Sequence, residues 1–311
     1  MSRQKFSTTI LGSNSALPAN GRRPTAQLLN VNHHYYLIDC GEGTQMQLRR
    51  FNLKMQRIKV VFISHLHGDH YYGLPGFLNS LHLLGREAPL KIYSPPGLKE
   101  IFILLTKAAN GRLGYPIEFI DLDPKSFGKE KREIYSDAEL HVEAFLLKHR
   151  IPCFGYLFKE QTKELSYLPK EGEKRGVKVA DISNLKRGQD IALENGDILD
   201  HKLVTSPSLD PRSYAFCTDT LPLDSTSEHV KNSTFLYHEA TFLEADRVRS
   251  KETYHSTAKQ AATVAKNAKV DTLVLGHYSA RYKSLEDHLK ESKEIFENSV
   301  LAVEGDELEF T

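Results

Sequence analysis

Four potential metal ligands occur within six residues, in the run His65-Leu66-His67-Gly68-Asp69-His70. Imidazole nitrogens and carboxylate oxygens are ligands that zinc binds in proteins. Because side chains alternate along an extended segment, His65 and His67 are expected on one side of it. Asp69 and His70 follow on a turn and can face a different point, which predicts two neighbouring metal ions. The alternative is a polar loop that happens to be rich in histidine, and four potential ligands in so tight an order argue against it.

Short apolar runs precede these and other polar residues along the chain. Such runs, rich in β-branched and aromatic residues, predict buried strands. Loops at strand ends are where a rigid sheet presents reactive side chains. Four runs have this form: residues 35–38 before Asp39, 59–64 before His65, 214–217 before Thr218 and Asp219, and 271–275 before Gly276 and His277.

Helical patterns alternate with the predicted strands. The best candidates are residues 44–51, 97–109, 256–267 and 284–298, and Ser256 or Thr257 is a possible N-cap of the third. This alternation predicts a layered α/β architecture.

Composition limits the remaining possibilities. The 311 residues include 41 Lys and Arg against 40 Asp and Glu, and 40% are hydrophobic, which is enough for a sizeable core. A net charge of +1 excludes the strongly basic footprint of many nucleic-acid-binding domains. Cys40, Cys153 and Cys217 lie far apart, so neither a disulfide framework nor a cysteine zinc cluster is expected. The apolar runs are too short to span a bilayer, and residues 1–20 lack a signal-peptide stretch, so we expect a soluble protein of the reducing cytoplasm.

Residues 159–190 differ from the rest of the chain. They contain eight Lys or Arg and six Asp or Glu, interspersed with one proline and three glycines. Such a segment is expected to bury little, which predicts a protruding insertion or flexible arm within a single catalytic domain of residues 1–311. An ordinary surface loop with two short strands is the alternative.

The His65 to His70 run matches in full the HxHxDH motif of the metallo-β-lactamase superfamily, which the sequence resembles. This resemblance implies a four-layer αβ/βα sandwich with further ligands from a distant His, a bridging Asp and a final His. The chain supplies His149, Asp219 and His277 in that order.

Longer motifs are similar to the ribonuclease Z family of tRNA 3′-processing endonucleases. They are the LIDCGEGTQ run at residues 37–45, the block from His65 to Gly76 that ends in Gly-Leu-Pro-Gly, and the sequences HEATF at 238–242, HSTA at 255–258 and GHYSARY at 276–282. They span residues 37–282, which is nearly the whole chain.

The resemblance implies the role of each site residue. It makes His65, His67 and His149 ligands of one zinc ion, Asp69, His70 and His277 ligands of a second, and Asp219 the bridge between them. It also makes Asp69 the proton acceptor and His255 the general acid. Two metals can activate a water and stabilise both the attacking and the leaving oxygen of a phosphodiester, and histidine titrates near the working pH. The alternative for His255 is a surface histidine at the start of a helix.

Several other residues have two interpretations each. Glu239, beside His238, orients a ligand imidazole or belongs to a buried structural pair. Asp39 and Glu42 either orient a ligand imidazole in the same way or cap the helix that begins near Thr44, where a negative charge is favourable. Basic residues that could contact RNA phosphates, or else only form a solvated surface, are Arg22, Arg23, Arg49, Arg50, Lys54, Arg57, Lys170, Lys174, Arg175, Lys178, Lys186, Arg187 and Arg281. Arg281 is favoured among them because it is four residues from His277.

Two positions depart from the family pattern. Thr218 stands before the bridging Asp where relatives often have glycine, and the arm lacks their Gly-Pro-rich tip. The resemblance implies a homodimeric, zinc-dependent endoribonuclease that removes the 3′ trailer of precursor tRNA. It would leave a 3′-hydroxyl on the tRNA and a 5′-phosphate on the trailer, with one subunit's arm holding the tRNA for the other. Alternatives are a zinc phosphodiesterase for small or cyclic phosphodiesters and a non-catalytic RNA-binding scaffold.

Overall fold

The computed structural model describes residues 5–109, 111–162 and 164–310. Two compact units divide the chain. The first joins Met1–Lys159 to Arg212–Thr311, and the second is Glu160–Pro211. Among the described residues, no helix is long and apolar enough to cross a membrane.

Two seven-stranded sheets form the first unit. The first sheet, in spatial order, is β18 (Glu307–Glu309), β1 (Phe6–Gly12), β2 (Ala26–Val31), β3 (His34–Ile38), β4 (Ile58–Phe62), β5 (Leu90–Ser94) and β6 (Ile117–Asp121). The second is β17 (Ser299–Leu301), β16 (Thr272–Gly276), β15 (Phe235–Glu239), β14 (Ser213–Cys217), β9 (Cys153–Glu160), β8 (Leu140–Leu147) and β7 (Arg132–Ser136).

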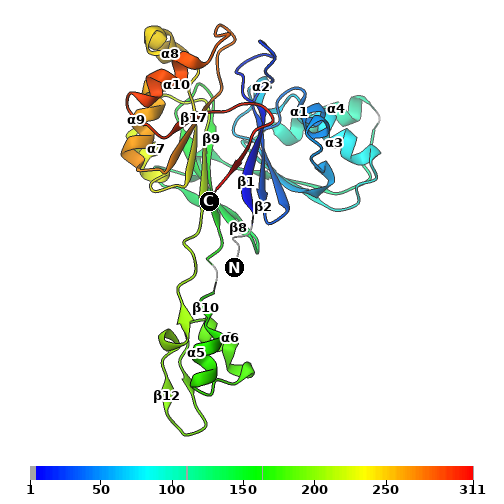
Figure 1. Ribbon diagram of the computed structural model, residues 1–311. Coiled ribbons are helices and arrows are strands. Elements are labelled where there is room, and N and C mark those ends of the chain that lie inside the picture. Colours follow the sequence, from blue (N-terminus) through cyan, green and yellow to red (C-terminus); the bar gives the residue numbers. More distant parts are fainter. Residues whose placement is uncertain (1–4, 110, 163, 311) are drawn as a thin grey trace. The chain divides into compact units, whose positions relative to one another are not determined.

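Helices cover the outer side of each sheet (Figure 1). On the first sheet they are α1 (Thr44–Arg50), α3 (Leu74–Leu83) and α4 (Leu98–Ala108), whereas the short α2 (Gly68–Tyr71) lies at the edge of the sheet. On the second they are α7 (Asp224–His229), α8 (Arg247–Thr253), α9 (Ala258–Ala268) and α10 (Glu286–Lys293). This is the four-layer αβ/βα sandwich that the sequence predicts.

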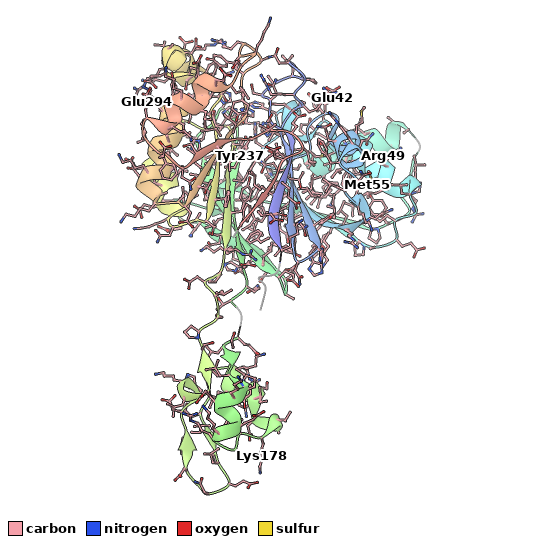
Figure 2. All side chains as sticks on the ribbon, viewed as in Figure 1. Glu42, Arg49, Met55, Lys178, Tyr237 and Glu294 are labelled. Carbon is pink, nitrogen blue, oxygen red and sulfur yellow. The ribbon has the colours of Figure 1, made fainter. Side chains whose placement is uncertain are left out.

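Aromatic side chains fill the space between the sheets. Phe62 from β4 packs against Tyr156 and Phe158 from β9, with ring centroids 5.5 and 5.3 Å apart. Phe216 and Tyr237 stack at 5.0 Å, and Tyr237 is fully buried (Figure 2). Because both faces of these strands are covered, their sequences are almost continuously apolar rather than alternating.

Parallel pairing brings the predicted polar strand ends to one edge. In the second sheet Cys217 of β14 pairs with His238 of β15, which pairs with Leu275 of β16. The residues that follow these three strands therefore meet at the same edge. In the first sheet, Ile38 of β3 pairs with Phe62 of β4, so Asp39 and the HxHxDH run also share an edge.

The predicted helices differ from the structure mainly at one end of the chain. Residues 44–51, 97–109 and 256–267 correspond to α1, α4 and α9. Thr257 is the N-cap of α9, and its hydroxyl accepts from the Gln260 amide in a capping box. The helix predicted over 284–298 is too long, because α10 ends at Lys293 and Asn298 instead bonds back to the Asp271 carbonyl at the start of β16.

Helix α3 is not among the predicted helices, although the spacing of its apolar residues could have revealed it. The buried residues Leu74, Phe77, Leu78 and Leu81 follow the i, i+3, i+4, i+7 pattern of a helix packed on one face.

The second unit has its own small core. It comprises β10 (Ser166–Tyr167), α5 (Pro169–Lys174), α6 (Ile182–Lys186), β11 (Ile191–Ala192), β12 (Ile198–Leu199) and β13 (Thr205–Ser206). The core residues Leu185, Ile191, Leu199 and Val204 are buried together. Of the described residues in 159–190, only Glu160, Gly172 and Leu185 are buried, so this segment buries little, as expected; Ile191, Leu199 and Val204, beyond position 190, complete the core.

Candidate metal centre

The structure brings all seven predicted ligands to the shared edge of the two sheets. His65 and His67 lie in the loop after β4, and Asp69 and His70 lie on α2. Asp219 and His277 directly follow β14 and β16, and His149 lies in the loop between β8 and β9. Their ligand atoms fall into two adjacent groups.

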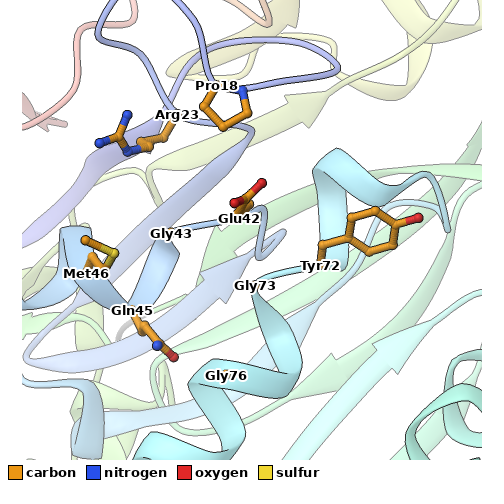
Figure 3. Close-up of a pocket in the computed structure, with 9 residues that line it drawn as sticks. All are labelled: Pro18, Arg23, Glu42, Gly43, Gln45, Met46, Tyr72, Gly73 and Gly76. Carbon is orange, nitrogen blue, oxygen red and sulfur yellow. The ribbon is translucent and has the colours of Figure 1, made fainter. Parts of the chain in front are cut away.

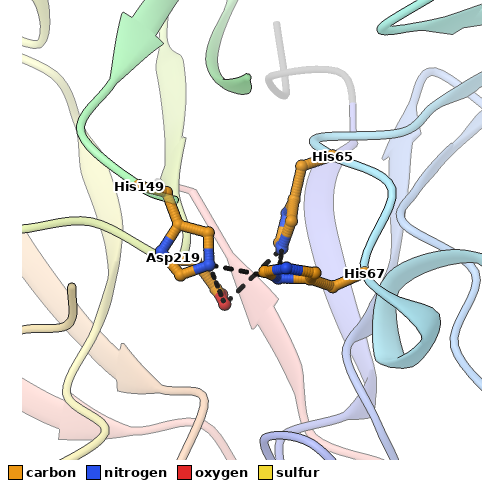
Figure 4. Close-up of side chains that lie close together, drawn as sticks. All are labelled: His65, His67, His149 and Asp219. Atoms are coloured by element: carbon orange, nitrogen blue, oxygen red, sulfur yellow. Dashed lines mark hydrogen bonds and ion pairs between the residues drawn. The ribbon is translucent and has the colours of Figure 1, made fainter. Parts of the chain in front are cut away.

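Three imidazoles form the first group (Figure 4). His67 Nδ1 lies 3.0 Å from His65 Nε2 and 3.1 Å from His149 Nε2. Asp219 Oδ2 lies 3.6 Å from both Nε2 atoms. The three rings come from two loops of the chain, the one after β4 and the one between β8 and β9, and their nitrogens point at one place.

The second group lies on the other side of Asp219. His70 Nε2 and His277 Nε2 are 3.3 and 3.0 Å from Asp219 Oδ1, and each is 3.5 Å from Asp69 Oδ2. The two carboxylate oxygens of Asp219 thus face different groups, which is the arrangement a bridging ligand requires. The expectation that Asp69 and His70 face a different point from His65 and His67 is confirmed.

These distances and polar atoms fit divalent cations. Two nitrogens bound to one tetrahedral zinc ion lie roughly 3.3 Å apart, which follows from zinc–nitrogen bonds of about 2.0–2.1 Å; the nitrogen–nitrogen spacings of 3.0 and 3.1 Å are slightly shorter, and the nitrogen–oxygen spacings to Asp219 are 3.0–3.6 Å. Among the described residues, His70 Nε2 and His277 Nε2 form no hydrogen bond and have only the Asp69 and Asp219 oxygens nearby; a metal ion shared with these oxygens would satisfy both nitrogens.

Protonation in the first group favours metal binding, whereas the charges of Asp69, Asp219 and Asp39 overcome burial and raise the pKa of His70 well above its usual value. Burial lowers the pKa of His65 well below its usual value and lowers that of His149, so both rings favour the neutral form that binds metals. Burial opposes ionisation of Asp219, but the nearby His277 and His70 hold its pKa well below the usual range. Asp219 is therefore a carboxylate.

Asp39 orients His70. Asp39 Oδ2 accepts from His70 Nδ1 at 2.7 Å, and its Oδ1 accepts from the Ser64 amide at 2.7 Å. A carboxylate on Nδ1 directs Nε2 of the same ring toward a metal and raises its basicity. Of the two interpretations of Asp39, the structure supports the orienting role. Glu42 has neither predicted role, because Gly43 caps α1 without a side-chain hydrogen bond and Glu42 lines a separate hollow.

Glycines allow the two loops at this edge to touch. A Cβ on Gly41 would lie 2.4 Å from the Asp69 carbonyl oxygen, and one on Gly73 would lie 2.0 Å from the Gly41 carbonyl oxygen. Any side chain at either position would push α2 away from the end of β3, and with it Asp69 and His70.

Glu239 is a fully buried hydrogen-bond acceptor that connects several site residues. Its Oε1 accepts from His255 Nδ1 at 3.0 Å and from the amides of Thr220 and Ser256. Its Oε2 accepts from the Thr241 hydroxyl at 2.6 Å, and that hydroxyl lies 2.9 Å from His277 Nδ1.

Glu239 therefore orients His255 directly. Through the Thr241 hydroxyl it also orients the imidazole of His277, one of the predicted ligands. Its neighbour His238 donates from Nδ1 to the Glu239 carbonyl at 2.7 Å, so only Glu239 of this pair reaches the site.

His255 lies next to both groups. It follows α8, and its Nε2 is 3.9 Å from Asp219 Oδ2. Burial lowers the pKa of His255, but the charges of Glu239 and Asp219 outweigh that effect and raise it to about 9. These carboxylates therefore favour the protonated ring, and its Nε2 faces the cleft.

An N-terminal loop also contacts the site, and the sequence did not predict this. The Ala16 amide donates to Asp69 Oδ2 at 2.7 Å, and Ala16 has the left-handed φ of 59°. Arg22 fastens this loop by donating to Asn14 Oδ1 at 2.9 Å and to the Tyr282 carbonyl at 2.7 Å. Arg22, considered a phosphate contact from sequence, instead holds two segments of the first unit together.

A cleft of about 440 Å³ opens over the two groups. Arg150 and Arg249 line it, and sequence analysis singled out neither as a phosphate contact. Arg281, favoured for its closeness in sequence to His277, pairs with Asp246 at 2.7 Å and lies over the Phe242 ring. Because the chain turns sharply at His277, which has a φ of 59°, closeness in sequence does not place Arg281 in the cleft.

A second hollow of about 430 Å³ adjoins the cleft at Tyr72 (Figure 3). Arg23, Glu42, Gln45 and Met46 line it, and Tyr72 separates it from the residues around the two histidine groups.

Comparison with known proteins identifies relatives along the whole chain. The family model described as "Anti-Pycsar protein Apyc1" matches residues 6–110. Ribonuclease Z of Bacteroides thetaiotaomicron is 42% identical over 97% of this chain and 94% of its own length. Ribonuclease Z of Parabacteroides distasonis is 41% identical over 96% and 97%.

Solved structures agree with this relationship. The short form of human tRNase Z has a TM-score of 0.69 and 26% identity, with 98% of this chain and 99% of that chain covered. The metallo-β-lactamase fold protein YhfI of Bacillus subtilis has the same TM-score at 17% identity, which shows a common fold.

The four-layer sandwich and its His- and Asp-lined edge define an enzyme of the metallo-β-lactamase fold that hydrolyses phosphodiesters with bound metal. Within that class, the chain belongs to the ribonuclease Z family of tRNA 3′-processing endoribonucleases.

Proposed function

We propose that this chain is a zinc-dependent endoribonuclease that removes the 3′ trailer of precursor tRNA and leaves a 3′-hydroxyl on the tRNA and a 5′-phosphate on the trailer. The strongest support is the position of Asp219 in this chain: its two carboxylate oxygens face two separate ligand groups. The chain is also 42% identical to a ribonuclease Z. Such a pair of sites suits the displacement at a phosphodiester, where an attacking and a leaving oxygen both need stabilisation.

The proposed ligands follow the two groups. His65, His67 and His149 would hold one zinc ion, Asp69, His70 and His277 a second, and Asp219 both. When bound, two zinc ions supply a water of lowered pKa and positive charge for the phosphate oxygens.

Asp69 and His255 supply the proposed proton transfers. Asp69 accepts the proton of the attacking water, and the Ala16 amide holds its carboxylate in place. His255, protonated on both nitrogens, gives its Nε2 proton to the departing 3′ oxygen while Glu239 holds Nδ1. A ribose alkoxide is a poor leaving group, so this proton contributes to the rate of RNA cleavage in particular.

The second unit is the proposed tRNA-binding arm. Several of its basic residues form exposed ion pairs, among them Lys178 with Glu194 at 2.8 Å and Lys186 with Glu164 at 3.0 Å. Exposed pairs of this kind contribute little to stability, so their cations can exchange carboxylate for RNA phosphate.

A homodimer is proposed on the evidence of α4. This helix is largely apolar, yet Leu98 is its one buried residue within the described chain. Ile103, Leu104 and Leu105 are 49%, 67% and 48% exposed. An isologous contact between two copies of this face would cover them.

The proposed location is the cytoplasm. Cys40, Cys153 and Cys217 are all buried and unpaired, which suits a reducing compartment.

End mapping on a precursor tRNA tests the proposed function. The zinc-loaded enzyme is expected to release a tRNA that ends in a 3′-hydroxyl and a trailer that begins with a 5′-phosphate. Reversed end groups would overturn the proposed chemistry. Rapid hydrolysis of small or cyclic phosphodiesters with no precursor cleavage would favour the alternative phosphodiesterase.

A further inference from the structure

Two arginines from different parts of the chain meet on one rim of the cleft. Arg150 directly follows His149, and Arg249 belongs to α8. Both line the cleft together with His149 and His255. Arg150 Nη2 donates to the Glu252 carbonyl at 3.3 Å, and Arg249 Nη1 lies 3.4 Å from Glu252 Oε2. Both guanidinium groups thus contact Glu252, Arg150 at its backbone carbonyl and Arg249 at its carboxylate.

Neither arginine forms a short ion pair. The pair between Arg249 and Glu252 is long, and the two side chains are 57% and 59% exposed, so it contributes little to stability. Among the described residues that line this cleft, Arg150 and Arg249 are the only arginines or lysines. Each guanidinium has donors free for an anion.

An RNA strand brings more charge to the cleft than the scissile phosphate alone. Each neighbouring phosphodiester has one negative charge and needs its own cation or water. Arginine suits this task because its planar fork donates two parallel hydrogen bonds to phosphate oxygens.

The direction of the strand follows from His255. If His255 protonates the departing 3′ oxygen, the nucleotide that ends the mature tRNA lies on the His255 side of the cleft. Arg249 and His255 belong to one short segment, and Arg150 adjoins His149, whose ring centroid is 5.2 Å from that of His255. The rim therefore adjoins the tRNA side of the scissile bond rather than the trailer side.

We propose that Arg150 and Arg249 together bind the phosphodiester immediately 5′ of the scissile one, and so position the 3′ end of the tRNA over the metal centre. This assignment deepens the proposed function and rests on it, because the direction of the strand depends on the 3′-hydroxyl product.

Substitution of one arginine, matched with a neighbour, tests the assignment. Arg249→Ala is expected to lower kcat/KM for precursor tRNA about tenfold, the order expected for a lost charge-assisted hydrogen bond. It should also reduce the slope of log(kcat/KM) against log[salt] by about 1. Arg247→Ala is the control: Arg247 lies on the same helix, is 63% exposed and pairs with Glu244 at 2.9 Å outside the cleft. It should change neither quantity.

A neutral phosphate in the substrate locates the contact. A methylphosphonate immediately 5′ of the scissile phosphate should slow the wild-type enzyme more than Arg249→Ala, which has already lost one of the two contacts, and should slow the double variant Arg150→Ala/Arg249→Ala less than about twofold. A methylphosphonate one position into the trailer should slow all three enzymes equally. Arg150→Ala should behave as Arg249→Ala does. Two results would overturn the proposal. One is a methylphosphonate immediately 5′ of the scissile phosphate that slows the wild-type enzyme and Arg249→Ala by the same factor. The other is a trailer methylphosphonate that slows Arg249→Ala less than the wild-type enzyme.

Glu252→Gln distinguishes binding from a structural role. It removes the competing carboxylate but keeps the backbone carbonyl that Arg150 contacts, so we expect a lower KM for precursor tRNA. A raised KM would contradict the proposal. Failure of the proposed function would be visible separately, as wrong end groups produced by the wild-type enzyme.

Discussion

Glu239 Oε1 accepts a hydrogen bond from His255 Nδ1 at 3.0 Å, and the opposite ring nitrogen of His255 lies 3.9 Å from the shared carboxylate Asp219. A buried carboxylate behind an imidazole fixes the tautomer, stabilises the imidazolium and leaves Nε2 as the one proton donor on the cleft side. This pairing separates His255 chemically from the seven proposed ligands, although it lies within reach of them.

His255→Ala is expected to retain both metal ions and to slow precursor tRNA cleavage by about 10²- to 10⁴-fold, the usual value of general acid catalysis. Hydrolysis of bis(p-nitrophenyl) phosphate should fall much less, because p-nitrophenolate departs without a proton. Both rates and the metal content are measured on the same preparation. Loss of metal would make His255 a ligand or a structural support, and equal losses of both activities would exclude the acid role.

Glu239→Gln is expected to move the alkaline limb of the kcat–pH profile to lower pH. The negative charge of Glu239 contributes to the raised pKa of His255, about 9. A histidine acid works only while protonated, so a lower pKa ends activity at lower pH. Loss of an adjacent charge shifts a pKa by roughly 1 to 3 units. A profile whose alkaline limb stays in place would show that His255 is not the group that titrates.

Asp219→Ala is expected to lose more metal than a change confined to one group. Elemental analysis should find about two zinc ions per wild-type chain and about one in His149→Ala, because His149 contacts the first group alone. Asp219→Ala should fall below one, since both sites lose an anionic ligand. Full metal content in Asp219→Ala would refute the bridging assignment.

Removing the second unit is expected to impair tRNA cleavage without abolishing the chemistry. Lys159 and Ser213 pair in antiparallel register, so a tight turn can replace residues 160–211 and keep β9 and β14 together. The variant should cleave precursor tRNA slowly and with weaker salt dependence, and it should still hydrolyse bis(p-nitrophenyl) phosphate. Equal loss of both activities, with metal retained, would place this unit in the active site.

Leu104→Glu is expected to convert a dimer into a monomer in sedimentation or light-scattering measurements, because it buries a charge in an apolar contact. Val248→Glu is the matched control. Val248 is 76% exposed on α8, so the same charge there should leave the dimer intact. A dimer that withstands Leu104→Glu would move the proposed contact away from α4.

Local patterns predicted a layered α/β fold and the HxHxDH ligands, and the family resemblance implied the other proposed ligands, His149, Asp219 and His277. The HxHxDH run follows a strand whose apolar residues are contiguous, and Asp219 and His277 also end strands. Strand formation and the two-residue alternation of side chains depend on near neighbours in the chain, so the sequence displays them directly.

The partners of those ligands were decided only by the tertiary structure. The Ala16 amide reaches Asp69 across 53 positions, and Asp39 reaches His70 across 31. Arg249 rather than Arg281 lines the cleft, because α8 packs beside His149 whereas Arg281 pairs with Asp246. Such contacts depend on which strand ends become neighbours in the two sheets and on how the chain turns after them. That depends on packing of the whole core, and no local pattern of residues records it.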